Sequence, residues 1–263
     1  MKAEMIFIRA TLFNIVFYTA NAVACVLCLP ALLLPRPAMI KFVRCYVRTI
    51  YFLEKHLIGL DFEIRGLENL PRDGSYIVAA KHQSAYETMK LHILFEDPAV
   101  VLKQELLRIP LWGWFLGRTH PIAIDRSQGK EAMKQVVDGA RRIEKENRAL
   151  VIFPQGTRVY TWQTPKDKPY KQGAARIFEQ TGMPLIPLAL NSGVFWPRKG
   201  WIKKPGKVVF SFLPPIPPDR KNDDILPMLQ EMIETETKKL EQEAIMPAAI
   251  SAPAKENSAG RTS

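Results

Sequence analysis

Cysteine is scarce in this chain. Its 263 residues include 3 cysteines, which are too few for the disulfide framework of a small secreted protein. Cys25 and Cys28 are spaced like a zinc-binding pair, but Cys45 is the one other thiol, so a four-cysteine zinc site is excluded. We interpret all three cysteines as small apolar side chains and expect no metal site.

Strong overall hydrophobicity is also absent, as is any excess of acidic charge. Hydrophobic residues make up 47% and charged residues 24% of the chain, values that exclude wholesale disorder. A mean hydropathy of −0.08 excludes a polytopic membrane protein. The 37 Lys and Arg against 26 Asp and Glu give a net charge of +11. Such a basic excess indicates an anionic partner, either nucleic acid or an anionic membrane surface.

One long uncharged stretch lies near the N-terminus. Residues 10–35 contain no charged side chain, and a helix needs about 20 apolar residues to cross a bilayer. The apolar core of a cleaved signal peptide is shorter. Because Asn14, Asn21 and Pro30 interrupt the stretch, it could cross the membrane or bend near Pro30 and return to the same leaflet. A buried core helix is the remaining alternative.

The segment that follows is basic and aromatic. Five cations and one acid, Glu54, lie between positions 36 and 55, and basic flanks stay on the cytoplasmic side of a membrane. The mixture over 37–60 predicts an amphipathic helix in the headgroup zone. Residues 1–60 hold seven cations and two anions, which points to anionic lipid. We therefore expect attachment to the cell inner membrane, with the rest of the chain on its cytoplasmic face, and no nucleic-acid partner.

Beyond position 60, short runs rich in Val and Ile alternate with helical segments. The predicted strands are 61–65, 75–80, 99–102, 121–124, 149–153, 184–190 and 207–213. The predicted helices are 84–95, 104–117, 129–147, 171–181 and 224–244. This alternation predicts an α/β fold, a mixed sheet covered by helices. The expected division is membrane-attachment helices over 1–60, a folded domain over 61–245, and a disordered tail, rich in Ala, Pro and Ser, over 246–263.

The first candidate catalytic residues follow the predicted strand 75–80. His82 can act as a base near neutral pH, and a carboxylate such as Glu87 can fix its tautomer. Five residues apart, the two side chains would point about 140° away from each other on one regular helix, so they can meet only if His82 precedes the helix. The capping-box pattern from Ser84 to Glu87 predicts a helix that begins at Ser84. The alternative is that Glu87 only caps the helix and His82 is an ordinary loop residue.

Basic side chains follow three other predicted strands. Lys103, Arg126 and Arg158 each lie just beyond a strand, and ligands bind at strand ends in α/β sheets. Together these cations could bind a phosphate. Each of them could instead form a surface ion pair.

These segments, in this order, resemble the glycerolipid acyltransferase family, whose type member is 1-acyl-glycerol-3-phosphate acyltransferase. The matching patterns are His-x4-acid at 82–87, Lys-Gln-Glu-Leu at 103–106, Ile-Asp-Arg at 124–126, Pro-x-Gly-Thr-Arg at 154–158, Lys-Gln-Gly-Ala at 171–174 and Ile-Pro-Leu at 186–188. The resemblance covers roughly residues 60–215. It implies transfer of an acyl group from acyl-CoA or acyl carrier protein to the hydroxyl of a lysolipid, with 1-acyl-glycerol-3-phosphate as the expected acceptor and phosphatidic acid as product.

The resemblance also assigns roles to residues. The matched positions are His82, Glu87, Lys103, Arg126, Gly156, Thr157, Arg158 and Pro187. It places the histidine as general base on the acceptor hydroxyl and the glutamate as the group that orients it. The lysine and the two arginines match positions associated with the acceptor phosphate. The glycine and threonine match the turn beside the active site, and the proline matches a motif that shapes the donor or acyl side.

The chain departs from the family pattern at two positions. Glu87 stands where the family usually has Asp, which adds one methylene of reach. Gln155 replaces the usual Glu, which removes a charge but keeps hydrogen bonding. A lyso-ornithine lipid or another lysophospholipid is therefore an alternative acceptor. A catalytically inactive membrane tether, and a serine esterase with Ser84 as nucleophile, are the alternatives to acyl transfer.

The implied reaction limits the partners that we expect. Ester exchange from a thioester needs a base and donors for the developing oxyanion, but no metal and no covalent enzyme intermediate. We therefore expect no cofactor other than acyl-CoA or acyl carrier protein as co-substrate, and membrane lipids as the other partner. Nothing in the sequence indicates an oligomeric state.

A second membrane contact is expected at residues 196–207. Trp196 and Trp201 favour the headgroup interface, and cations such as Lys203 and Lys204 would add attraction to anionic lipid. Proline and glycine in this segment predict an exposed loop. The alternative is a solvated loop whose tryptophans cover the core.

Overall fold

Seven strands form one sheet in the computed structural model, which describes residues 3–217 and 222–246. The strands are β1 (Leu60–Arg65), β2 (Tyr76–Ala80), β3 (Ala99–Lys103), β4 (Ile122–Ile124), β5 (Ala149–Ile152), β6 (Leu185–Leu190) and β7 (Gly206–Phe212). Their order is β1-β7-β6-β2-β5-β3-β4, and every pair is parallel except β6 with β7. The predicted mixed α/β sheet is confirmed, with each strand within one residue of its expected bounds.

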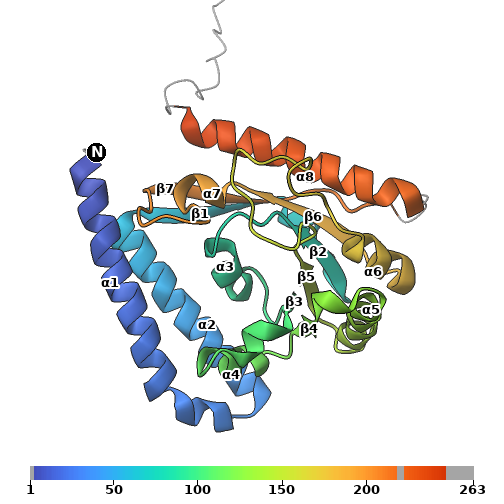
Figure 1. Ribbon diagram of the computed structural model, residues 1–263, viewed down its shortest axis with the longest axis horizontal. Helices are drawn as coiled ribbons and strands as arrows, with labels where there is room; N and C mark the ends of the chain where they lie inside the picture. The colour runs from blue at the N-terminus through green and yellow to red at the C-terminus, as the bar shows by residue number, and fades with distance from the viewer. Residues whose placement is uncertain (1–2, 218–221, 247–263) are drawn as a thin grey trace, which may run out of the picture.

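Helices cover both faces of this sheet (Figure 1). The helices that the structure describes are α1 (Ala3–Leu27), α2 (Arg36–Leu53), α3 (Tyr86–Leu94), α4 (Trp112–Gly117), α5 (Lys130–Lys145), α6 (Gly173–Thr181), α7 (Ser192–Phe195) and α8 (Asn222–Ile245). Successive residues of β2 face opposite ways, as the strand pleat requires. Ile77 and Ala79 pack in a core with α5, α6 and α8, while Val78 and Ala80 pack in a second core with α3 and α1.

The predicted helix over 104–117 is divided in two. A 3₁₀ turn, η4 (Gln104–Arg108), precedes α4, and Leu111 between them has a φ of 62°. Pro110 explains the break, because its ring disfavours the helical conformation for the residue before it. The tail expected at 246–263 lies, from residue 247 onward, outside the described residues.

The N-terminal helices form a hairpin. α1 leads through the 3₁₀ turn η1 (Leu29–Leu33), which contains Pro30, into α2, and a π-helical turn, η2 (Glu54–Ile58), then leads to β1. Among the described residues α1 is the one helix long and apolar enough to cross a membrane, but only 17% of its most apolar window is buried. It is therefore not the core helix that we considered as an alternative. The chain bends at η1 and returns toward the sheet (Figure 1).

The first half of α1 is attached to the folded domain through polar groups. Asn14 is fully buried, its amide donates to the Trp201 carbonyl at 2.8 Å, and its Oδ1 accepts from the Lys203 Nζ at 2.5 Å. Trp196 is also buried and stacks edge-on against Phe13. The expectation that Trp196 and Lys203 face a membrane is therefore wrong, because both side chains bind α1. In this loop Trp201 remains 48% exposed.

A buried ion pair joins the hairpin to α3. Glu54 at the end of α2 bonds Lys90 of α3, and both side chains are fully buried. Burial raises the pKa of Glu54 to about 7 and lowers that of Lys90, while the attraction between the two charges opposes both changes. The Lys90 ammonium also lies 4.1 Å from the ring centre of Tyr86. The pair therefore fixes the position of α3, which begins four residues after His82.

Removing one member of this pair should destabilise the protein strongly. We expect Glu54→Leu or Lys90→Met alone to lower the free energy of unfolding by about 3–5 kcal/mol, because each leaves a buried group without its partner. The double variant should recover most of that loss, since it buries two apolar side chains instead. Chemical denaturation of the three variants measures this; additive losses in the double variant would contradict it.

Candidate active site

The loop after β2 and the first turn of α3 bring His82 and Glu87 together. The His82 Nδ1 lies 2.8 Å from the Glu87 Oε1. His82 precedes the helix, which begins at Tyr86, so the contact forms in the way that the spacing requires. The imidazole is 14% exposed and the carboxylate 1%, so only the histidine can be reached from solvent.

Glu87 accepts four hydrogen bonds. Its Oε1 accepts from the backbone amides of Gln83 and Ser84, both at 2.7 Å, in addition to His82, and its Oε2 accepts from the Ser192 hydroxyl at 2.7 Å. The two interpretations of Glu87 are therefore compatible: it caps the start of α3 and contacts the histidine. The capping box is incomplete, because the Ser84 Oγ accepts from the Tyr86 amide instead of the Glu87 amide.

This arrangement favours one histidine tautomer. The Glu87 oxygens accept hydrogen bonds from two amides and a hydroxyl, which favours the form in which the His82 Nδ1 carries a proton and donates it. The Nε2 atom then keeps its lone pair and can accept a proton from a bound hydroxyl. The ring also stacks on Phe153, with ring centres 4.0 Å apart. The site thus holds the imidazole in a fixed orientation.

The turn after β5 lies against this histidine. The Val159 amide donates to the His82 carbonyl at 2.8 Å, which places Thr157 and Arg158 beside the loop that carries His82. Gly156 has a φ of 68°, a conformation that glycine adopts without strain. The Arg158 side chain is exposed. Gln155, by contrast, is 4% exposed and its amide donates to the Lys168 carbonyl at 3.1 Å, a bond that a glutamate could not donate.

The remaining predicted residues lie at or near the same edge of the sheet. β2, β5, β3 and β4 are adjacent and parallel, so their C-terminal ends meet at one edge. Lys103 is exposed there and pairs in register with Ile124. The backbone of Arg126 follows β4, but its side chain lies outside the described part of the structure. Pro187 is buried within β6, opposite Ala79. The structure joins His82 and Glu87 by a direct hydrogen bond. It brings these other residues near the same part of the sheet.

Comparison with known proteins identifies the family. Residues 61–191 match the family model described as Acyltransferase. The chain is 39% identical over 177 residues to the 1-acyl-sn-glycerol-3-phosphate acyltransferase of Pseudomonas aeruginosa, a match that covers 67% of each chain. The chain belongs to the glycerolipid acyltransferase family.

A further relative and a solved structure are also similar to this chain. The 1-acyl-sn-glycerol-3-phosphate acyltransferase of Saccharomyces cerevisiae is 32% identical over 180 residues, which are 67% of this chain and 58% of that protein. The crystal structure of the 1-acyl-sn-glycerophosphate (LPA) acyltransferase of Thermotoga maritima superposes with a TM-score of 0.72 over 89% of this chain and 96% of that one. At 21% identity that likeness shows the fold alone.

Helix α8 of this acyltransferase supports the loop that carries His82 in a way that the sequence analysis missed. Gln83 donates from its amide to Glu241 of α8 at 2.6 Å and accepts from the Gly193 amide at 3.0 Å. Lys81 forms an ion pair with Glu234 of α8 at 2.5 Å. Burial raises the pKa of Glu241 above its ordinary value. The loop is therefore held from the side opposite to the hairpin.

Ser192 was missed as well, although it contacts the Glu87 carboxylate directly. It begins α7 immediately after β6 and is fully buried. The signal that could have found it is the one used for the arginines: the polar sequence Asn191-Ser192-Gly193 directly follows a strand that is apolar throughout.

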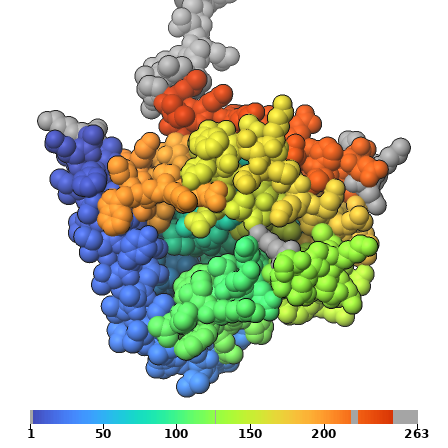
Figure 2. Space-filling view, viewed as in Figure 1, coloured from blue at the N-terminus to red at the C-terminus, as the bar shows by residue number. Residues whose placement is uncertain are grey.

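Two hollows lie near the loop that carries His82. A cavity of about 170 Å³ lies beside Phe153 and Gly156 and is otherwise lined mainly by apolar side chains of β3, β4 and α5, among them Val101 and Met133. Figure 2 shows a wider hollow in the surface, bordered by the blue N-terminal helices, the green segment around α4, and the yellow and orange segments that follow β5 and β6. The teal colour of the β2–α3 region is visible at its floor.

Exchange of Glu87 for Gln should separate capping from catalysis. The amide oxygen can still accept from the Gln83 and Ser84 amides, so we expect the free energy of unfolding to change by less than about 1 kcal/mol. Loss of the negative charge should lower the acyl-transfer rate about 10²–10⁴-fold, because the imidazolium is no longer stabilised.

Thermal unfolding and steady-state kinetics measure the two effects. Glu243→Gln on α8, where the exposed carboxylate pairs with Arg65, is the matched control and should leave both unchanged. A less stable Glu87→Gln protein with normal turnover would mean that Glu87 is a cap only.

Proposed function

We propose that this acyltransferase transfers a fatty acyl group from acyl-CoA or acyl carrier protein to the free hydroxyl of 1-acyl-glycerol-3-phosphate, forming phosphatidic acid. The observation that carries the proposal is the 2.8 Å contact between His82 and Glu87. The names of the Pseudomonas and Saccharomyces relatives support the choice of acceptor.

His82 acts as the general base in the proposed step. Its Nε2 takes the proton of the acceptor hydroxyl while the oxygen attacks the thioester carbonyl, and Glu87 stabilises the imidazolium that forms. When the tetrahedral intermediate collapses, the C–S bond breaks and the proton passes from His82 to the leaving thiolate. The step needs no metal and no cofactor beyond the thioester, because the histidine supplies the proton transfer and the thiol is a good leaving group.

The cations at the sheet edge form the proposed acceptor phosphate site. Arg158 follows the turn at Gly156 and Thr157, and Val159 ties that turn to His82. Lys103 ends β3. Neither side chain forms an ion pair with a carboxylate among the described residues, which weighs against the surface ion-pair alternative and leaves their charges available to a phosphate.

The acyl side of the reaction is proposed to lie at the cavity beside Phe153. This cavity of about 170 Å³ is lined mainly by apolar side chains, with Lys171 also at its wall, and adjoins the ring that stacks on His82. Such a lining suits part of an alkyl chain. We infer that Pro187 acts through the position of β6 and makes no contact with the substrate, because it is buried within the sheet.

Membrane attachment is proposed at the hairpin. Its apolar side chains are unusually exposed, with Leu27 at 72% and Leu33 at 89%. Trp112 and Trp114 of α4, also exposed, lie on the segment whose Arg118 binds the Leu34 carbonyl at the hairpin bend. Because Asn14 in the middle of α1 is bonded to the folded domain, we infer that the hairpin enters one leaflet and does not cross the bilayer.

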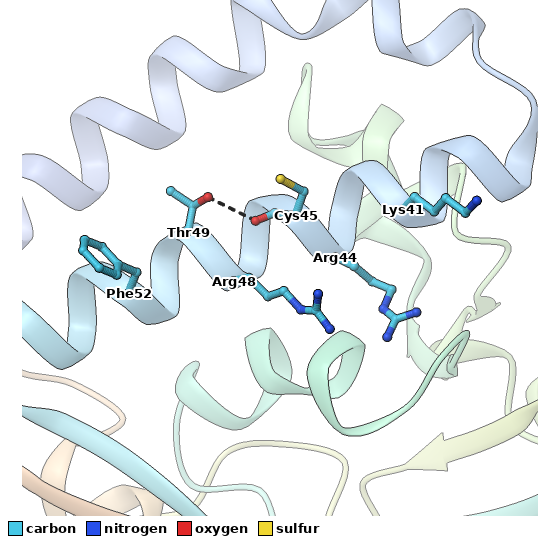
Figure 3. A pocket seen from close by; sticks show the side chains of 6 residues that line it. All are labelled: Lys41, Arg44, Cys45, Arg48, Thr49 and Phe52. Atoms are coloured by element: carbon cyan, nitrogen blue, oxygen red, sulfur yellow. Dashed lines mark hydrogen bonds between the residues drawn. The ribbon is translucent and has the colours of Figure 1, made fainter.

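Basic side chains of α2 support this attachment. Figure 3 shows Arg44 and Arg48 extending side by side from α2, and with Lys41 they line a surface groove of about 550 Å³. Their charge suits anionic lipid headgroups. We propose that the attachment is to the inner membrane, with the domain over 61–245 on the cytoplasmic side, where basic flanks remain.

An acceptor panel tests the proposed function. The purified full-length enzyme is offered 1-acyl-glycerol-3-phosphate, a lysophospholipid with an esterified phosphate, and a lyso-ornithine lipid, each with both donor types. We expect 1-acyl-glycerol-3-phosphate to give the highest kcat/KM. His82→Ala should lower turnover about 10²–10⁴-fold without loss of folding or vesicle binding.

Faster turnover of another acceptor would mean that the proposed acceptor is wrong and that the proposed reaction, acyl transfer, still holds. A His82→Ala rate within about tenfold of wild type would remove the histidine from the mechanism. An intact, folded wild-type protein that turns over no acceptor would support the inactive tether.

Arg158→Ala should affect the acceptor more than the donor. Loss of a charged hydrogen bond to phosphate should raise the KM for 1-acyl-glycerol-3-phosphate about tenfold or more, with little change in the KM for the thioester. Arg141→Ala, on the exposed face of α5, is the control and should change neither. A rise in the KM for the thioester donor alone would mean that Arg158 binds the donor phosphates instead.

A further inference from the structure

The loop between β5 and α6, which is drawn in yellow in Figure 1, carries two stacked aromatic rings. The Tyr160 and Trp162 ring centres are 5.4 Å apart and their planes differ by 8°. Trp162 is 71% exposed, so one face of the indole is open to solvent. A ring in this state does not belong to the core, and none of the functions described above uses it.

The loop holds these rings in place. The Tyr160 amide donates to the Gln163 Oε1 at 3.0 Å, and the Gln163 amide donates to the Tyr160 carbonyl at 3.0 Å. A second turn follows, in which Asp167 accepts from the Thr164 amide at 2.8 Å. The stack is therefore ordered before any ligand arrives, and such preorganisation favours binding.

Positive charge surrounds the stack. The Arg198 guanidinium lies 5.4 Å from the Tyr160 ring centre, and no ion pair with a carboxylate occupies it among the described residues. Lys166 is exposed on the same loop. Asp167 lies between Lys166 and Lys168 in sequence, and its carboxylate accepts hydrogen bonds from the amide and hydroxyl of Thr164. The surface therefore combines a free aromatic face with unpaired cations.

This surface borders the catalytic loop. Val159, next to Tyr160, donates to the His82 carbonyl at 2.8 Å. Thr161 packs so closely on Gly193 that a Cβ there would lie 3.0 Å from its methyl group. A ligand that extends from the stack can therefore reach the reacting imidazole through a flexible arm.

We propose that Tyr160, Trp162 and Arg198 bind the nucleotide end of coenzyme A. The inference rests on the proposed transfer from a thioester and names the donor as acyl-CoA. The adenine would stack on the free face of Trp162, because every base presents a planar face to an aromatic ring. Arg198 and Lys166 would bind the phosphates. The phosphopantetheine arm of an acyl carrier protein has no base to place on the indole.

A bilayer also attracts tryptophan and basic residues, but the surroundings of the stack disfavour it. Among residues 157–169 the exposed side chains other than Trp162 are polar, charged or proline, and Val159 is buried. The exposed aliphatic side chains that would enter a membrane belong to the hairpin instead. In Figure 2 the yellow loop lies on the upper part of the molecule, away from the hairpin bend at the bottom.

The test compares two donors that share one acyl chain, acyl-CoA and acyl-pantetheine, in detergent with the full-length protein. We expect Trp162→Ala and Arg198→Ala to raise the KM for acyl-CoA about tenfold, to leave kcat unchanged, and to leave acyl-pantetheine kinetics unchanged. Trp162→Phe should retain most of the affinity, because it keeps an aromatic face. Arg176→Ala, an exposed arginine on α6, is the charge control.

Adenosine 3′,5′-bisphosphate supplies a readout that does not depend on turnover. Calorimetry should show that it binds the wild-type protein and binds Trp162→Ala about tenfold more weakly. Because no acceptor takes part, this measurement decides the nucleotide site even if the proposed acyl transfer fails.

Three results would overturn the proposal. Equal losses with both donors would mean that the loop serves folding or the catalytic loop. Unchanged kinetics and no binding of the bisphosphate would mean that the stack has no donor role. With acyl carrier protein as a third donor, a rise in KM for that donor alone would assign the surface to a protein donor.

Discussion

The Glu87 carboxylate accepts hydrogen bonds from the His82 ring, from two backbone amides and from the Ser192 hydroxyl. One oxygen thereby closes the loop after β2 onto the start of α3, and the other ties that loop to the end of β6. A carboxylate with this many donors favours the tautomer in which the His82 Nδ1 carries the proton. The contacts that shape this part of the fold are therefore also the contacts that orient the His82 ring.

Contacts from both ends of the chain hold this centre. On one side the Glu54–Lys90 pair fixes α3 to the hairpin, and on the other Glu234 and Glu241 of α8 bind Lys81 and Gln83. The residues that flank His82 are thus restrained by segments about 150 positions away in sequence. A rigid support of this kind keeps the imidazole in one orientation.

Much of the fold could be predicted from the sequence, because each strand is a short apolar run bounded by polar residues and by turns. The helix over 104–117 could not, since the effect of Pro110 on its neighbours outweighs the apolar pattern. The His82–Glu87 contact was one of two alternatives left by the sequence, since the spacing allows it only if His82 precedes the helix and the capping-box pattern favours that helix start. Ser192 was missed because its partner lies 105 residues earlier, and the burial of Lys203 because it depends on Asn14, 189 residues away. Short-range patterns do not carry such distant pairings.

The bond between Asn14 and Lys203 has a consequence for the evolution and engineering of the enzyme. Lys203 is 4% exposed, and its ammonium donates to the Oδ1 of Asn14 on α1 and to the Trp201 carbonyl. An enzyme trimmed of its hydrophobic leader would uncover an ammonium, an indole and the apolar patch that Phe13 fills. The apolar helix α1 therefore cannot be removed without exposing buried side chains of the folded domain. The helix and the domain must be inherited, exchanged or redesigned together.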